Sequence, residues 1–109
     1  MFKDEHGDTP LHVASRAGIL TAVQTLCHCG APVNVANRSS LTPLHVAAKE
    51  GYIDIVRVLC LAKANVAQKN KDGLTAEIIA LAQEHTETAT LLSRLKQVNH
   101  HFSYSLLQQ

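Results

Sequence analysis

The hexapeptide TPLHVA occurs twice in this sequence of 109 residues, first from Thr9 and again from Thr42. Six identical residues seldom recur by chance in so short a chain, so the spacing of 33 residues indicates an internal repeat. The same spacing leads to Thr75, in a third and more divergent copy. The copies occupy residues 3–36, 37–69 and 70–97. A period of this length is typical of proteins whose similar units stack in one direction.

Each of the first two copies carries start and stop signals for a short helix. Thr9 and Thr42 can accept a hydrogen bond from an unpaired backbone N–H at a helix start, and the proline that follows each has no N–H to leave unpaired. Gly18 and Gly51 come eight residues after those prolines, and glycine readily adopts the left-handed conformation at a helix end. We expect a second helix to turn back directly after each glycine.

The second helices share an apolar stripe with the spacing i, i+1, i+4, i+5, which marks one buried helical face. Its members are Ala22, Val23, Leu26 and Cys27 in the first copy and Ile55, Val56, Leu59 and Cys60 in the second. Between copies, GAPVNVANRSSL and KANVAQKNKDGL are rich in turn-forming residues and predict extended arms with tight turns. The sequence therefore predicts an all-α solenoid of stacked helix-turn-helix pairs with protruding arms.

The pattern D-x-x-G-x-T-P-L-H-x-A-A-x-x-G resembles the ankyrin repeat, and residues 4–18 and 37–51 follow it closely. We expect an ankyrin repeat domain over residues 1–97 and a C-terminal tail over residues 98–109. The last copy, with VRVLCLAKANV before it, is similar to the terminal ankyrin repeats of death-associated protein kinases. That resemblance implies a catalytic domain outside this sequence, and the interior pattern of the first copy fits the end of a longer array.

The third copy departs from the pattern in the way expected of a terminal repeat. It replaces the Pro, Leu and His of TPLH by Ala76, Glu77 and Ile78, and its second helix carries the polar residues Thr86, Glu87, Thr88 and Thr90. Polar residues on the outward side suit a unit that no further repeat covers. We expect the tail to be partly ordered, with helix extension and disorder as alternatives, because it contains Phe102, Tyr104, Leu106 and Leu107.

Composition excludes several classes of function. With 46% hydrophobic and 17% charged residues the chain can bury a core, and a net charge of +1 gives no broad positive field for nucleic acid or anionic lipid. The start MFKDEHGD has no apolar stretch for a signal peptide, and no run approaches the roughly 20 apolar residues of a membrane span. We expect a soluble protein of the cytoplasm, with the nucleus as an alternative.

No motif for catalysis or for a cofactor is evident. The sequence contains no glycine-rich phosphate loop and no G-x-S-x-G element. Cys27-His28-Cys29 lacks the paired ligand spacing of zinc modules, so we expect Cys27 and Cys60 to be reduced, buried core thiols. The resemblance implies that His12 and His45 link neighbouring turns by hydrogen bonds. We expect no enzyme, no cofactor and no metal; an enzyme using these Cys or His residues is the least favoured alternative.

The resemblance also implies a protein-binding module whose contacts come from the turn tips and the exposed sides of the first helices. The alignment of the copies gives the tip positions Glu5, His6, Asp8, Arg38, Ser39, Leu41, Lys71, Asp72 and Leu74, and the helix positions Arg16, Lys49, Glu50 and Gln83. We expect Leu41 and Leu74 to face solvent as apolar anchors, with packing between neighbouring arms as the alternative.

Charge suggests the kind of partner. The second copy has five basic and two acidic residues, whereas the first and third are slightly acidic. A basic unit between acidic neighbours is suited to a protein partner with an acidic segment, and simple solvation of these surface charges is the alternative. A rigid spacer, or an intramolecular regulatory clamp within a larger kinase or signalling protein, is the alternative function. Nothing in the sequence specifies the oligomeric state, and we favour a monomer.

Overall fold

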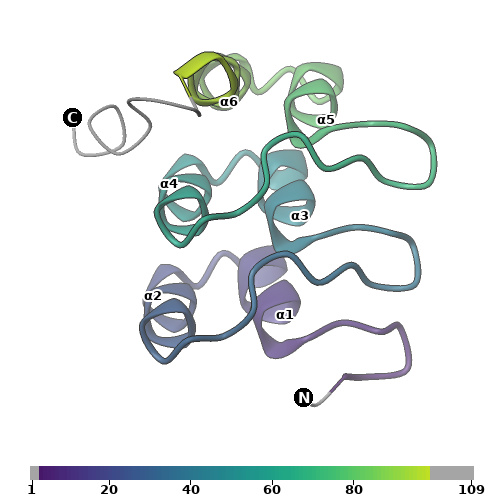
Figure 1. Ribbon diagram of the computed structural model, residues 1–109, viewed down its shortest axis with the longest axis vertical. Coiled ribbons are helices and arrows are strands. Elements are labelled where there is room, and N and C mark those ends of the chain that lie inside the picture. The colour runs from purple at the N-terminus through teal and green to yellow at the C-terminus, as the bar shows by residue number, and fades with distance from the viewer. Residues whose placement is uncertain (1–2, 99–109) are drawn as a thin grey trace.

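The computed structural model describes residues 3–98, which form six α-helices and no strand. The helices are α1 (Pro10–Ala17), α2 (Leu20–His28), α3 (Pro43–Glu50), α4 (Ile53–Leu61), α5 (Ala76–Ala82) and α6 (Thr86–Val98). They form three stacked pairs, with α1, α3 and α5 in one layer and α2, α4 and α6 in the other (Figure 1). The predicted all-α stack of helix pairs is confirmed. No helix in residues 3–98 is long and apolar enough to cross a membrane.

The first helix of each pair begins at the predicted threonine. Thr9 accepts a hydrogen bond from the backbone N–H of His12, and the His12 ring nitrogen Nδ1 accepts one from the Thr9 backbone N–H at 3.0 Å. Thr42 and His45 form the same reciprocal pair at the start of α3, with an N···Nδ1 distance of 3.1 Å. Thr75 also caps α5, although the residue three positions later has no ring to return the bond.

The glycines that end α1 and α3 are required by the packing of the next repeat as well as by the backbone. Gly18 and Gly51 have φ angles of 74° and 77°, in the left-handed region that favours glycine. A Cβ atom on Gly18 would lie 2.8 Å from the Tyr52 ring, and one on Gly51 would lie 2.6 Å from the His85 ring. The repeats therefore approach each other too closely at these turns to leave room for a side chain.

The core runs through the stack between the two helix layers. Leu11 and Leu44 from the first helices are buried, as are Val23, Val56 and Leu59 from the second helices. The predicted apolar stripe is thus confirmed as the buried face of α2 and α4, with Ala22, Leu26 and Cys27 half-buried at the edge of the core. The expectation that Cys27 is fully buried like Cys60 is wrong, because the first pair has a neighbour on one side only among the described residues.

The outer side of the third repeat differs from the expected polar surface. Thr88 is buried, with 2% of its surface exposed, because it lies at the position equivalent to Ile55 in the core. Ile78 and Leu81 on α5 are instead 44% and 54% exposed. The outer side of the third repeat is therefore polar only in part, for example at the exposed Glu87. The tail for which partial order is expected lies, from residue 99 onward, outside the described residues.

Candidate protein-binding surface

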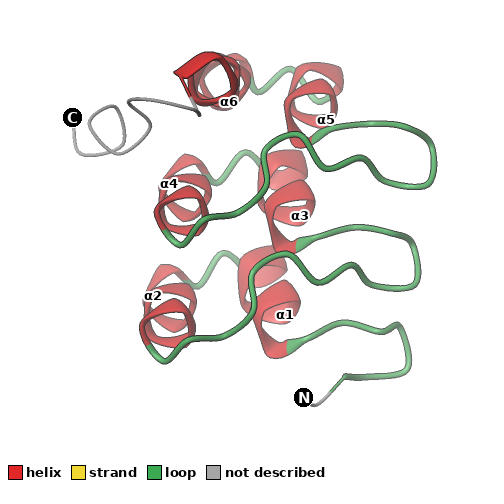
Figure 2. Ribbon diagram, viewed as in Figure 1, coloured by secondary structure: helices red, strands yellow, loops and turns green. Residues whose placement is uncertain are grey.

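The segment before α1 and the two loops between helix pairs project as three arms beside the layer formed by α1, α3 and α5 (Figure 2). We call the surface made by the arm tips and the exposed sides of these helices the arm-side surface. Of the predicted contact residues, all are exposed except Asp8, Leu41 and Leu74. The exposed set is Glu5, His6, Arg16, Arg38, Ser39, Lys49, Glu50, Lys71, Asp72 and Gln83.

One side chain at the base of each arm shapes its turn. Asp4, Asn37 and Asn70 each accept hydrogen bonds on a single side-chain oxygen from the backbone N–H groups two and four residues later, at 2.9 to 3.0 Å. The first two arms are also joined directly, since the Arg38 N–H donates to the carbonyl oxygen of His6 at 3.1 Å. Side-chain bonds to the local backbone are what make Asp and Asn effective turn residues. The arm tips are thereby held in defined positions.

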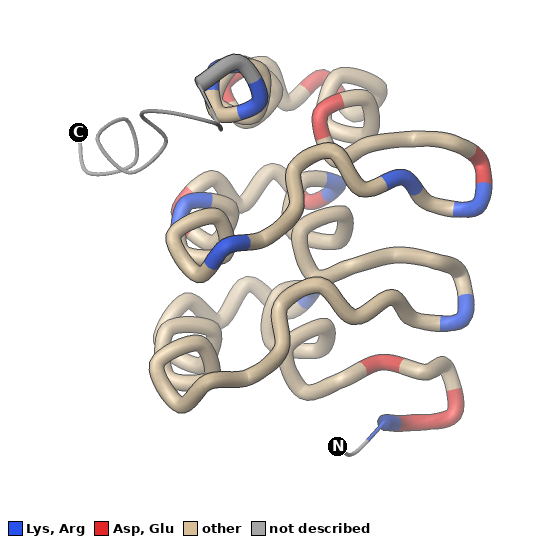
Figure 3. Tube along the Cα trace, viewed as in Figure 1, with Lys and Arg blue, Asp and Glu red and all other residues tan. Residues whose placement is uncertain are grey.

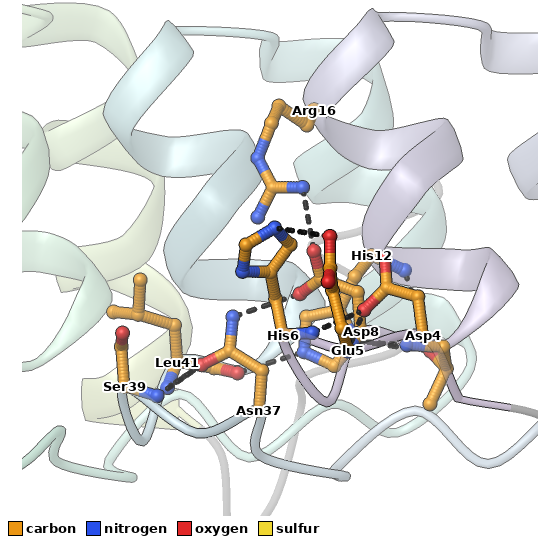
Figure 4. A network of polar contacts seen from close by, with 10 residues as sticks. Asp4, Glu5, His6, Asp8, His12, Arg16, Asn37, Ser39 and Leu41 are labelled. Atoms are coloured by element: carbon orange, nitrogen blue, oxygen red, sulfur yellow. Dashed lines mark hydrogen bonds and ion pairs between the residues drawn. The ribbon is translucent and has the colours of Figure 1, made fainter.

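The Asp8 side chain is buried beneath the arm-side surface and is not part of the exposed arm tip. Only 4% of its surface is exposed; Oδ2 accepts a hydrogen bond from Arg16 Nη1 at 2.8 Å and Oδ1 accepts one from Asn37 Nδ2 at 2.9 Å (Figure 4). Burial by itself raises the pKa of this carboxyl group, but the bonds from Arg16 and Asn37 outweigh that effect and hold the pKa below its ordinary value. The expectation that Asp8 faces solvent is wrong, because its partners come from α1 and from the next arm.

The leucines at the equivalent positions are half-buried, so the expectation that they face solvent is also wrong. The carbonyl oxygen of Leu41 accepts a hydrogen bond from His12 Nε2 at 2.7 Å, and that of Leu74 accepts one from His45 Nε2 at 3.1 Å. Both rings accept on Nδ1 and donate from Nε2, which requires the neutral tautomer, and burial lowers the pKa of both imidazoles. The histidines therefore link successive repeats, as the resemblance implies.

Comparison with protein-family models agrees with this architecture. A model described as ankyrin repeats in three copies matches residues 33–102, and one for a single ankyrin repeat matches residues 6–38. The chain belongs to the ankyrin repeat family. Ankyrin repeats are generally protein-interaction modules. A search of curated proteins found no match to the chain.

Charges are unevenly distributed over the arms of this ankyrin repeat chain. Figure 3 shows acidic residues on the first arm and mainly basic residues on the second and third arms. Arg38 and Lys71 are exposed at the tips, and Lys49 is exposed at the end of α3. Arg16 is already paired with Asp8 and has 46% of its side chain exposed. The ankyrin repeats thus present free basic groups mainly on the second and third units.

The described part of the ankyrin domain offers few reactive groups. Residues 3–98 contain no cluster of three or more His, Cys, Asp or Glu side chains that could hold a metal ion. Burial raises the pKa of the Cys60 thiol to about 12 and also raises the pKa of Cys27, so the nucleophilic thiolate is scarce at both sites. The arrangement of the arm-side surface is suited to binding through shape and charge.

Proposed function

We propose that this chain binds another protein through the arm-side surface and has no catalytic activity of its own. The observation that carries the proposal is that the exposed tip residues stand on arms whose turns are held by Asp4, Asn37 and Asn70. A surface ordered before binding loses less conformational entropy when a partner docks, so more of the contact energy appears as affinity. Membership in a family of interaction modules supports the same reading.

The partner favoured by the charge distribution is a protein with an acidic segment. Arg38, Lys49 and Lys71 are exposed and make no ion pair within the described residues. Charge complementarity of this kind mainly raises the association rate and selects among partners. Arg16 adds a guanidinium group that Asp8 holds in place at the edge of the same surface.

Affinity capture from cell extract with matched charge-reversal variants tests the proposal. Arg38→Glu with Lys49→Glu reverses two charges on the arm-side surface, while Arg57→Glu with Arg94→Glu does the same on α4 and α6 in the other layer. We expect a captured partner to be lost from the first variant and kept by the second. Circular dichroism checks that both remain folded. A partner retained equally by both variants, or lost equally from both, would argue against the arm-side surface.

A second candidate function is a structural role within a larger protein, as a spacer or an intramolecular clamp. An apolar groove of about 660 Å³ lies between α1 and α2 at the open end of the stack. Val13 and Ile19 in this groove are each 50% exposed, whereas Val46, the equivalent of Val13, is 5% exposed beneath the first repeat. Apolar surface of this kind commonly marks a contact with another protein surface. If α1 in the isolated chain exchanges its amide hydrogens as slowly as α3, the open end needs no neighbour and this role is disfavoured.

A further inference from the structure

The outer side of α5 leaves two large apolar side chains without a partner among the described residues. Ile78 and Leu81 are 44% and 54% exposed. In the preceding repeat the equivalent residues are His45 and Ala48, which are 2% and 0% exposed because α5 covers them. The third repeat therefore presents, at its free end, the side of the helix that is covered in the two units before it.

Another repeat of the same kind does not fit this side of α5. Ser15 and Ala48 are fully buried where consecutive first helices meet, so a small side chain is needed at this position for the close approach. Leu81 places a much larger side chain there. Ile78 also occupies the position of His45, whose Nε2 donates a hydrogen bond to the carbonyl oxygen of Leu74 in the next arm. Isoleucine cannot form such a bond to the arm of an added repeat.

The turn after α5 disfavours the stacking of a further repeat for a separate reason. Glu84 occupies the position of Gly18 and Gly51 and keeps the left-handed backbone, with a φ of 63°. At those glycines an added Cβ would lie 2.8 Å from Tyr52 or 2.6 Å from His85 of the following repeat. In an added unit stacked in the same way, a residue placed like Tyr52 or His85 would collide with the Cβ of Glu84. In a second copy of this chain stacked head to tail, that residue would be Ile19.

The chain itself supplies a segment with suitable chemistry that starts beside this surface. Lys96 Nζ lies 3.4 Å from Glu77 Oε1, so the end of α6 is held next to the start of α5, one residue before Ile78. The segment 99–109 follows directly and carries the apolar residues Phe102, Tyr104, Leu106 and Leu107. Phe102 is six residues beyond Lys96 and can lie up to about 20 Å away along an extended chain, which is ample to reach Ile78 and Leu81.

We propose that residues 99–109 fold back over α5 and cover Ile78 and Leu81, closing the stack at this end. Burying these side chains against those of the tail removes apolar surface from water on both partners. Because the tail is a single segment and not a helix pair, Leu81 and Glu84 do not obstruct it. The tail then takes the place of a fourth repeat, with a different shape.

Hydrogen exchange on the full chain tests the proposal through a double-mutant comparison. The double substitution Phe102→Ser with Leu106→Ser removes two apolar side chains from the tail's side of the proposed contact. The double substitution Ile78→Ser with Leu81→Ser removes the apolar side chains on the α5 side of the same contact. We expect the tail variant to speed exchange of the α5 amides about tenfold while leaving α1 and α2 unchanged. When the helix substitutions are already present, the tail substitutions should cause little further acceleration, because coupled residues have non-additive effects.

A matched control uses the other end of the stack, where Val13 and Ile19 are exposed to a similar extent. In a Val13→Ser, Ile19→Ser background the tail substitutions should retain their full effect on α5. Unchanged α5 exchange in the tail variant would overturn the proposal, and so would equal acceleration in the wild-type and helix-variant backgrounds. Protection of α5 that depends on protein concentration, with dimers in sedimentation, would show that a second copy covers this surface instead of the tail.

Discussion

Replacement of Gly51 by Ala gives the sharpest test of how the repeats approach each other. The new Cβ would lie 2.6 Å from His85 Nδ1 and 2.8 Å from His85 Cγ. Because Cγ sits at the base of the ring, the side chain cannot avoid the contact by moving only its far end. Gly73 provides a matched control, since it also has a positive φ, 78°, but a Cβ there would meet nothing within 4 Å.

The two substitutions should differ by the energy of the clash. Placing Ala in the left-handed region costs about 1 kcal/mol, and this is the whole expected effect at Gly73. At Gly51 we expect overpacking to add about 2 kcal/mol, for a total loss of about 3 kcal/mol in the free energy of unfolding. Part of that loss comes from the hydrogen bond between His85 Nε2 and the carbonyl oxygen of Lys49, which is 3.0 Å long.

Urea unfolding followed by far-ultraviolet circular dichroism measures these losses. A His85→Ala background removes the ring, so the cost of Gly51→Ala in that background should fall to about 1 kcal/mol, as at Gly73. Equal losses for Gly51→Ala and Gly73→Ala would refute the close approach. That result would also remove the steric argument that Glu84 prevents a further repeat from stacking on α5.

Three further outcomes follow from buried polar and thiol groups. Asp8→Ala should lower the free energy of unfolding by about 2 kcal/mol in urea titrations, because it leaves the half-buried Asn37 amide and the Arg16 guanidinium without their acceptor, whereas removal of an exposed carboxylate should change it by less than about 0.5 kcal/mol. Burial lowers the folded-state pKa of His12 and His45, so the unfolded chain binds more protons below their ordinary pKa of 6.5 and stability should fall as the pH drops through this range. In thermal melts the midpoint temperature of the wild type should fall as the pH is lowered, and this pH dependence should largely disappear when both histidines are replaced by Gln. A wild-type midpoint that does not change with pH would contradict the neutral rings. Thiol labelling of the native protein should modify the exposed Cys29 first and leave Cys60 unmodified until unfolding, and fast labelling of Cys60 would contradict its burial.

Sequence reasoning succeeded where the signal is local or repeated. Thr9 and Thr42 begin helices and Gly18 and Gly51 end them, because capping and left-handed turns depend on residues within one or two helical turns. The buried stripe in α4 follows from helical periodicity, which the chain carries twice. The link from His12 to the next arm was implied by the ankyrin resemblance and could not be derived from spacing alone.

Sequence reasoning failed where exposure depends on contacts between repeats. Asp8 occupies the position of Leu41 and was assigned to the exposed tip, yet Arg16 and Asn37 surround it with hydrogen bonds. The available signal was the change from Leu to Asp at one repeat position together with a nearby arginine. Thr88 was assigned to the outer surface from its polarity, although its register with Ile55 places it in the core.

The sequence by itself determined the number of repeats, the helix starts, the glycine turns and the family, because each depends on short-range conformational preferences written more than once. The tertiary structure decided which side chains are accessible, because accessibility depends on neighbours about one repeat away and on position within the stack. Val13 and Val46 share a sequence context but are 50% and 5% exposed, since only the second has a repeat packed over it. Ile78 and Leu81 are exposed for the same reason: in a solenoid each unit is covered by the next, and no described residue packs over this side of the third unit.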